Sequence, residues 1–475
     1  MKKHYKTMSL LILCLAGLAG CASLSARQAL LEVSEDVYRR TGKKISWNTG
    51  TKADLDVDKR VKKLLSGRLT AKAVIQIALL RNRSLQATYT DLGVAQADLV
   101  QAGLLRNPIL DAAVTFPEGA DVPNLSFGLA FKFIDMFLIP LRKEAAKSEL
   151  EQAKLRVSGA VIDHTTRTHL AYIDHVAAQQ QVNLLKQVIR SISASVDTAR
   201  ALREAGNITT LQYDQQKNAL TQSKLELANA ELTSGQTRER LNVLMGLTGS
   251  ETHWRAPDRL PGIPSIRGSL KNIEGQAVKS SLNLAEIKQE LQTIAIRYRI
   301  TNVLSVLPDL EAGGEYERDD GEVERGPIVE IEIPIFDTGK AKRAKVILEV
   351  RKLRDQYWDM GVRIRSAARL YKAKLLTQRK TLSYYRSTVL PESQRMVKGM
   401  QRDYNAMQSS VFQLINARKQ QIVTGQKYIA AQQSYWKTFI SFQQLTSGRL
   451  PDSAGMESSG KIESAQAGSG ESGGH

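Results

Sequence analysis

The stretch LSFGLAFKF, residues 125–133, places an apolar side chain at every second position and small, polar or basic residues between them. This period of two is the pattern of a β-strand whose two faces meet different surroundings. Residues 110–116 alternate in the same way, and the segment from Pro117 to Pro123 between them has a composition suited to a surface turn. The sequence therefore predicts a β-hairpin over residues 110–133.

The same arrangement returns about 200 residues later. Residues 310–317 alternate apolar or small residues with glutamates, and residues 329–333 alternate again. The polar segment from Asp319 to Pro327 is predicted to be the turn that joins them. The repetition predicts an internal duplication of the chain.

Long helices are predicted after each hairpin. No proline occurs from Leu141 to Arg255, and apolar residues recur there at steps of three and four. A helix from Leu141 to about Ala205 would extend roughly 95 Å at about 1.5 Å per residue. The heptad positions are Val182, Leu185, Ile189, Ile192 and Val196 in the first half, and Leu382, Tyr385, Val389, Glu392 and Met396 in the second.

Each long helix is expected to end in a tight turn that starts a returning helix. Ala205, Gly206 and Asn207 resemble a helix stop, and Thr209 with Gln212 has the spacing of a capping box. Ser410 with Gln413 repeats this spacing in the second half. Each half therefore reads as strand hairpin, long helix, tight turn and long helix.

The N-terminus has the features of a secretory signal. Lysines precede an apolar run from Met8 to Leu18, and the run ends in LAGC at residues 18–21. This tetrapeptide resembles a bacterial lipobox, which implies lipid attachment at Cys21 after removal of residues 1–20; an ordinary signal peptide is the alternative. Ala22 in place of Asp implies sorting to the outer membrane. The chain's two cysteines both lie in its first 21 residues, so no later disulfide or thiolate metal site is expected.

No run of 18 apolar residues follows Cys21. Any membrane crossing must then be made by strands, which in lipid have to close into a barrel to satisfy their backbone groups. Four strands are too few, because about eight is the practical minimum, so oligomers would be required. The alternative is a soluble sandwich of four amphipathic strands.

Several motifs resemble the outer-membrane efflux channel family whose type member is TolC, and the likeness covers nearly everything from Leu69 to about Ser447. The first are an initial helix over residues 69–79 and the sequence QAGLLRNP at residues 101–108. The others are IPIFDTG at residues 333–339 and the pair Leu390–Pro391, placed inside a helix that the proline should kink or open.

The resemblance implies a mainly α fold with a small membrane β-barrel. Three protomers would each contribute four strands to a 12-stranded outer-membrane barrel, and long coiled-coil helical hairpins would form a periplasmic α-barrel below it. Residues 22–68, residues 248–272 and the start of the C-terminal stretch would form a belt around this tunnel. The expected organisation is a signal peptide at 1–20, a lipidated and equatorial segment at 21–68, repeats at 69–271 and 272–447, and a Ser/Gly-rich tail at 448–475.

The function implied is that of a trimeric exit duct in a tripartite efflux or type I secretion system. Its expected partners are a periplasmic membrane-fusion adaptor, an inner-membrane transporter of the RND type, and outer-membrane lipid. Two alternatives are a periplasmic coiled-coil adaptor and a structural lipoprotein without a pore. The sequence does not name the exported substrate.

A duct needs a lining and a gate. Acidic positions of the strands are the predicted pore lining, where carboxylates either favour cations or only keep the wall wet: Asp111, Glu311, Glu315, Glu317, Glu330 and Glu332. The gate is predicted at the helix turns, at Gly206, Asn207, Thr209, Leu211, Asp214, Tyr404, Met407, Ser410, Phe412 and Gln413. Met407 stands where the family favours glycine, so the second turn is expected to differ in shape from the first.

The formal net charge is +19, with many of the bases between Lys340 and Lys380. No nucleic-acid motif is recognised. We interpret these basic residues as a solvated helix face, or as a face that contacts an acidic adaptor or cell-wall polymer. The sequence carries no HExxH, P-loop or GxSxG pattern, so no catalytic site, metal site or cofactor is expected. His164, His169 and His175 are predicted to be polar surface or tunnel residues, and only the pair 11 residues apart could share a helix face.

Overall fold

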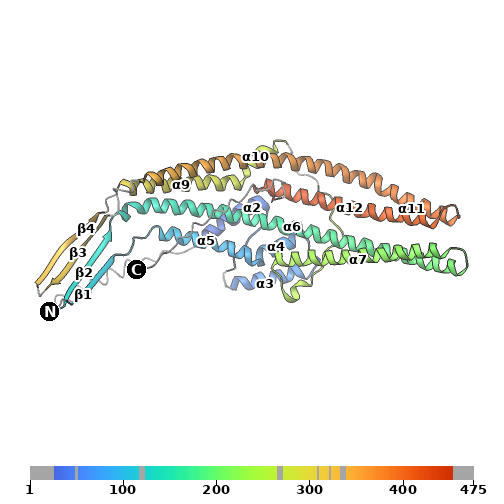
Figure 1. Cartoon of the computed structure of the whole chain (residues 1–475), viewed down its shortest axis with the longest axis horizontal. Coiled ribbons are helices and arrows are strands. Elements are labelled where there is room, and N and C mark those ends of the chain that lie inside the picture. Colours follow the sequence, from blue (N-terminus) through green and yellow to red (C-terminus); the bar gives the residue numbers. More distant parts are fainter. Residues whose placement is uncertain are drawn as a thin grey trace. The chain divides into compact units, whose positions relative to one another are not determined.

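A computed structural model of the chain describes residues 26–48, 52–116, 123–264, 271–306, 310–319, 322–331 and 339–452. Helices and four strands alternate along these ranges (Figure 1). The first half contains α2 (Ala26–Thr41), α3 (Lys52–Leu65), α4 (Ala71–Arg81), α5 (Arg83–Gln101), β1 (Ile109–Thr115), β2 (Asn124–Lys132), α6 (Ile134–Glu204), α7 (Thr210–Met245) and the short 3-10 helix η1 (Gly249–Thr252). The second contains α8 (Ile273–Ser280), α9 (Leu282–Val306), β3 (Leu310–Asp319), β4 (Glu322–Ile331), α10 (Lys340–Tyr384), a π-helical turn η2 (Tyr385–Val389), α11 (Leu390–Asn405) and α12 (Val411–Thr446).

The order of the elements is similar in the two halves, as the predicted duplication requires. In each half, helices lead into a strand hairpin, a long helix follows the hairpin, and a second helix returns. The first long helix, α6, has 71 residues and begins at Ile134 instead of Leu141, so Pro140 lies inside it. A proline near a helix start removes one backbone donor where few helical bonds have yet formed, which explains why the helix tolerates it.

All four strands form one antiparallel sheet in the order β1-β2-β3-β4. The two hairpins are joined by pairing of β2 with β3, in which Phe127 lies opposite Tyr316 and Lys132 opposite Glu311. The Lys132 ammonium lies 2.6 Å from the Glu311 carboxylate, which pins this register at one end. At the other end the Asn124 side-chain amide donates to the Asp319 carboxylate.

The predicted turn from Asp319 to Pro327 is wrong. Glu324 pairs with Glu317 and Pro327 with Gly314, so most of this segment belongs to β4. The charges suggested a loop, yet Val323, Arg325 and Pro327 continue the alternation that Val329 and Ile331 display. Pro327 lies on β4, an outer strand in the sheet order of this chain, and outer strands are where prolines within sheets usually occur.

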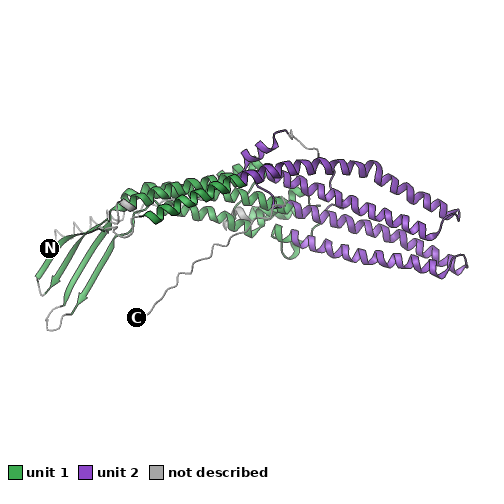
Figure 2. Cartoon of the chain, turned by 45° about the horizontal axis from the view of Figure 1, so that its top comes forward, with its two compact units in different colours: residues 1–168, 242–255, 282–359 green, residues 169–241, 256–281, 360–475 purple. Residues whose placement is uncertain are grey.

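The chain divides into two compact units, coloured separately in Figure 2. Unit 1 comprises residues 1–168, 242–255 and 282–359 and includes the sheet. Its core joins α2, α4, α5 and α6 through buried apolar side chains, which are Val33, Val37, Ile75, Leu79, Leu85, Tyr89, Leu92, Ala153, Val157 and Val161.

Polar contacts hold α9 along α6 in unit 1. The Ser148 and Thr293 hydroxyls lie 2.8 Å apart, and Gln289 donates to Ser148 at 2.8 Å. Farther along the same pair of helices, Arg297 forms an ion pair with Glu149 at 2.7 Å. The backbones of Arg68 and Arg255 pair as an isolated parallel β-bridge, which joins the segment after α3 to the segment after η1.

Unit 2 comprises residues 169–241, 256–281 and 360–475, and its helices include the ends of both long hairpins. Val196 and Ala199 of α6 pack against Tyr213 of α7 beside the first turn. Lys437 of α12 reaches Asp174 of α6 at 2.7 Å, so the two hairpins are also joined within this unit.

Candidate functional site

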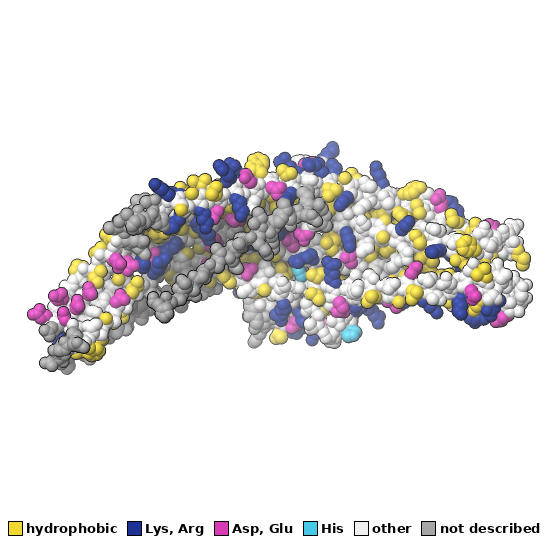
Figure 3. Space-filling model, viewed as in Figure 1, with side chains coloured by type: hydrophobic (Ala, Val, Ile, Leu, Met, Phe, Trp, Pro, Cys, Tyr) yellow, Lys and Arg dark blue, Asp and Glu magenta, His cyan; other side chains and the backbone are white. Residues whose placement is uncertain are grey.

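One face of the sheet is acidic. Side chains of directly paired residues lie on the same face, and the register places Asp111, Gly128 and Glu315 in one row. Acidic side chains gather over the sheet in the space-filling view (Figure 3, magenta). The described carboxylates on this face are Asp111, Glu311, Glu315, Glu317, Asp319, Glu322, Glu324 and Glu330. Lys132 is the one cation among the described strand residues that share it.

Several of these carboxylates oppose one another directly. Glu311 pairs with Glu330 and Glu317 with Glu324 across β3 and β4. Like charges at directly opposed strand positions are destabilising, by up to about 1 kcal/mol per pair. The sheet therefore keeps an arrangement that stability alone would not favour, and such a face needs water beside it.

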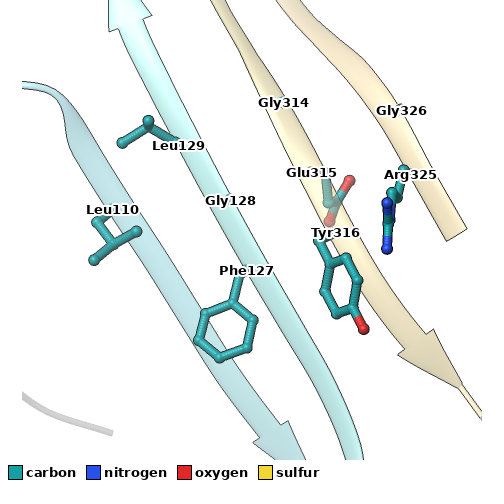
Figure 4. A pocket seen from close by; sticks show the side chains of 9 residues that line it. All are labelled: Leu110, Phe127, Gly128, Leu129, Gly314, Glu315, Tyr316, Arg325 and Gly326. Carbon is teal, nitrogen blue, oxygen red and sulfur yellow. The ribbon is translucent and has the colours of Figure 1, made fainter. Parts of the chain in front are cut away.

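The opposite face is mainly apolar and uncovered, and Arg318 and Arg325 are its charged residues among the described strands. Leu110 is 70% exposed and Val329 is 63% exposed, and Phe127, Phe131 and Ile331 are also exposed on this side. Figure 4 shows Phe127 of β2 beside Tyr316 of β3, with ring centroids 6.5 Å apart, and Arg325 beside Tyr316. The Arg325 guanidinium carbon lies 5.4 Å from the Tyr316 ring centroid. A shallow hollow of about 480 Å³ is bordered by Phe127, Leu129, Gly314 and Tyr316, among others.

The predicted alternation is therefore confirmed: the structure places Asp111, Glu311, Glu315, Glu317 and Glu330 on one face. The sequence reading missed Asp319, Glu322 and Glu324, which it assigned to a turn. Their alternation with Arg318, Val323 and Arg325 was the signal that could have found them. Glu332 and Cys21 lie outside the described residues, as do the predicted signal peptide and most of the predicted tail.

A buried carboxylate joins the sheet to the helices. Asp135, at the start of α6, has a side chain that is almost fully buried and lies 2.8 Å from the Arg142 guanidinium and 3.3 Å from that of Arg106. Arg142 also donates to the Asp135 backbone carbonyl at 3.1 Å. Two cations around one buried carboxylate fix the chain where β2 becomes α6.

The first helix turn has the predicted capping box. The Thr209 backbone N–H donates to Gln212 Oε1 at 2.8 Å, and the Gln212 backbone N–H donates to Thr209 Oγ1 at 3.2 Å. Gly206 has a left-handed φ of 76°, and the Asn207 N–H donates to the Leu202 carbonyl at 2.8 Å. These bonds satisfy the helix ends on both sides of the turn.

The second turn has the same construction, which corrects the expectation that Met407 would change its shape. Met407 has φ 60°, and the Gln408 N–H donates to the Asp403 carbonyl at 2.8 Å, as Asn207 does to Leu202. Ser410 and Gln413 complete the capping box at 2.8 and 3.3 Å. The cap bonds on both sides hold the left-handed residue in place even though it is not glycine.

Pro391 perturbs its helix, as predicted. The five residues before Leu390 form the π-helical turn η2, and the Leu390 N–H donates to the Tyr385 carbonyl. Proline has no backbone donor and its ring crowds the preceding turn, so one extra residue is accommodated there. The heptad position Leu382 just before it is fully buried.

The histidines differ from the prediction. His164 is 5% exposed and His175 is 2% exposed, so these two are core residues and not surface residues. Burial, and secondarily Arg167, lowers the pKa of His164 to about 4 against the opposing hydrogen bond with the Leu244 carbonyl. Burial and Arg238 lower the pKa of His175 to about 4 in the same way. The alignment of positions 11 apart on one helix face was read correctly, but the neighbouring elements that cover that face were not visible in the sequence.

Across the described ranges, no helix is long and apolar enough to cross a membrane. In those same ranges, no group of three or more His, Cys, Asp or Glu side chains is arranged to hold a metal ion.

Comparisons with known proteins agree with this architecture. Residues 74–247 match the family model described as outer membrane efflux protein. The chain is 22% identical to the cobalt-zinc-cadmium resistance protein CzcC of Cupriavidus metallidurans over 366 residues, covering 74% of this chain and 84% of that protein. It is 23% identical to outer membrane protein OprJ of Pseudomonas aeruginosa, covering 59% of this chain and 63% of OprJ. The CmeC outer membrane channel of Campylobacter jejuni has a similar fold, with a TM-score of 0.68 at 14% identity over 86% of this chain and 90% of CmeC.

Proposed function

We propose, on the premise that this chain belongs to the outer membrane efflux protein family, that it is the exit duct of a tripartite efflux or type I secretion system. Substrates would pass from an inner-membrane transporter of the RND type and a periplasmic membrane-fusion adaptor to the exterior. Three copies would form the duct, anchored by lipid at Cys21 in the outer membrane.

The two-faced sheet carries this proposal. Its exposed apolar face suits contact with lipid. In water, an uncovered apolar patch of this kind would reduce the solubility of the protein. The acidic face suits a water-filled lumen. The sheet has only four strands, and β1 and β4 are the outer ones in its order. In lipid their free edges must be paired, which three copies would achieve as 12 strands.

Conductance tests the duct directly. Purified full-length protein, reconstituted in planar bilayers, is expected to form discrete channels and to migrate as a heat-modifiable trimer. Phe127→Asp, on the apolar face, should abolish insertion because an aspartate would face lipid. Glu317→Gln, on the acidic face, should insert normally. A monomer that gives no channels would overturn the proposal, as would equal insertion of both variants.

The acidic face is proposed as a pore lining that favours cations. In a salt gradient, the wild-type reversal potential should indicate cation preference. Joint replacement of Glu311, Glu315 and Glu317 by glutamine should move it toward zero. One relative is named for cobalt, zinc and cadmium resistance, so divalent metal ions are the first cargo to test in export assays. Equal permeability to both ions of the salt would remove the lining role and leave the duct intact.

The gate is proposed at the helix turns, the expected periplasmic ends of the duct. Leu211 and Phe412 follow the two turns and are exposed, so glutamates there should repel across a closed entrance and raise single-channel conductance. Leu225→Glu on α7 is the control, because Leu225 is also exposed but lies farther along the helix. Unchanged conductance in Leu211→Glu and Phe412→Glu would place the gate elsewhere.

A further inference from the structure

A cavity of about 790 Å³ lies between the two helical hairpins of unit 2, close to their turns. All four helices line it: Ile192 comes from α6, Ala219 from α7, Gln401 from α11 and Leu414 from α12. This volume is within the range of about 300–1,000 Å³ typical of small-molecule sites. The lining mixes aliphatic side chains with amides and hydroxyls, so it suits a molecule that has both an apolar and a polar part.

Arg418 of α12 is the most distinctive group in this lining. Its Nη1 donates to Ser195 Oγ at 2.8 Å and to Ser191 Oγ at 3.4 Å, both on α6. Its Nη2 donates to Gln401 Oε1 of α11 at 2.7 Å. The guanidinium is therefore held in a fixed position between the hairpins by uncharged acceptors.

No carboxylate among the described residues lies within 4.0 Å of Arg418. Other partly buried arginines differ. Arg81 lies 2.6 Å from Asp58 and 3.1 Å from Glu251. Arg142 lies 2.8 Å from Asp135. Arg418 is partly buried, and this burial lowers the pKa of its guanidinium. A nearby anion would favour the charged form.

The charged residues of the cavity lining also favour an anionic ligand. Lys419 and Glu226, the other two charged residues of the lining, are both exposed, so Arg418 is its one partly buried charge. Aliphatic side chains from opposite hairpins, Ile192 and Leu414 with Ile422, border the same space. The cavity thus offers a planar donor fork at one place and apolar surface beside it.

We propose that this cavity binds an amphipathic organic anion, whose carboxylate or sulfonate pairs with Arg418 while its apolar body lies against Ile192, Leu414 and Ile422. The guanidinium fork matches the two oxygens of such a group. A ligand placed there contacts both hairpins at once and supplies a counter-charge that no described residue places within 4.0 Å of Arg418. The site does not depend on the proposed export function, and binding can be measured without any channel assay.

The test uses purified full-length protein in nonionic detergent and two probes of nearly equal shape, naphthalene-2-carboxylate and its neutral carboxamide. Equilibrium dialysis at neutral pH measures the binding of each, and protein-free micelles correct for partition into detergent. Wild-type protein is expected to bind the carboxylate at least tenfold more tightly than the carboxamide. Arg418→Gln should lose at least tenfold in affinity for the carboxylate and little for the carboxamide.

Two further variants separate binding from structural damage. Arg369→Gln is the matched control, because Arg369 is also in unit 2 but pairs with Glu274 at 2.7 Å and does not line the cavity. It should bind both probes as the wild type does. Ala219→Leu leaves Arg418 intact but fills the space from α7, so it should weaken both probes. Equal binding of the two probes by the wild type, or undiminished binding by Arg418→Gln or Ala219→Leu, would overturn the proposal.

Discussion

Met407 has the same left-handed backbone conformation as Gly206, with φ angles of 60° and 76°. The two residues occupy equivalent places in the two helix turns, yet only one of them is glycine. Met407 is 95% exposed, so packing of its side chain does not offset the strain of its backbone conformation. The duplicated halves therefore differ in local strain although their turns have the same shape.

Met407→Gly should consequently stabilise the protein. Removing the strain of a left-handed methionine should raise the free energy of unfolding by about 1–2 kcal/mol. The greater conformational freedom of glycine in the unfolded chain should lower it by about 0.5–1 kcal/mol. The net gain in the free energy of unfolding should be on the order of 1 kcal/mol, measured by denaturation followed by circular dichroism. Gly206→Ala should have the opposite sign, and a Met407→Gly protein no more stable than wild type would contradict the assignment of strain.

Gly313→Ala should disrupt the pairing of β2 with β3. A Cβ at this position would lie 2.1 Å from the Leu129 carbonyl oxygen, and the strands would have to separate. The cost should be at least about 2 kcal/mol, seen as a lower melting temperature of the folded protein in detergent. Gly326→Ala on β4 is the matched control, because a Cβ there meets no atom within 4 Å. Similar melting temperatures for the two variants would show that the close approach of β2 to β3 is not what limits this position.

Pro391→Ala should restore regular α-helical bonding through residues 385–389. The alanine supplies the missing backbone donor and removes the ring that crowds the preceding turn, a change worth up to about 3 kcal/mol. Hydrogen exchange of the amides from Tyr385 to Leu390 should slow. If exchange there is as fast as in the wild type, the π-helical turn has another cause, and the tyrosine pair Tyr385–Tyr428, with ring centroids 6.0 Å apart, is the next candidate.

Acid should destabilise the helical core through His164 and His175. Their pKa values fall from 6.5 to about 4 on folding, so the folded state favours the neutral imidazoles. Above pH 6.5 the histidines are neutral in both states, and the free energy of unfolding is at its full value. As the pH falls from 6.5 toward 4, only the unfolded state takes up protons, so the free energy of unfolding decreases by up to about 3 kcal/mol per histidine. Melting temperatures measured across this window should fall less steeply for His164→Gln and His175→Gln.

His253 provides the comparison for that experiment. It is exposed on the segment after η1, so His253→Gln makes the same replacement outside the core. An equally steep fall in the two core variants and in the wild type would assign the acid sensitivity to other groups.

The sequence by itself determined most of the elements around the two hairpins and their order, apart from the first half of β4. Strand alternation over residues 125–133, the capping boxes at Thr209 and Ser410, and the effect of Pro391 are all local, because each depends on residues within a turn or two of one another. The repetition of these signals also predicted the duplication. The predicted division into repeats and the residue-level gate remain predictions.

Only the tertiary structure decided which residues meet from distant parts of the chain. The pairing of β2 with β3 extends the acidic face to Asp319, Glu322 and Glu324, and the packing around α6 removes His164 and His175 from water. Arg418 becomes notable for the same reason, since its hydrogen-bond partners lie on α6 and α11, and no carboxylate of the described residues forms an ion pair with it. Burial and charge pairing depend on contacts across hundreds of residues, and such contacts leave no periodic trace in the sequence around each residue.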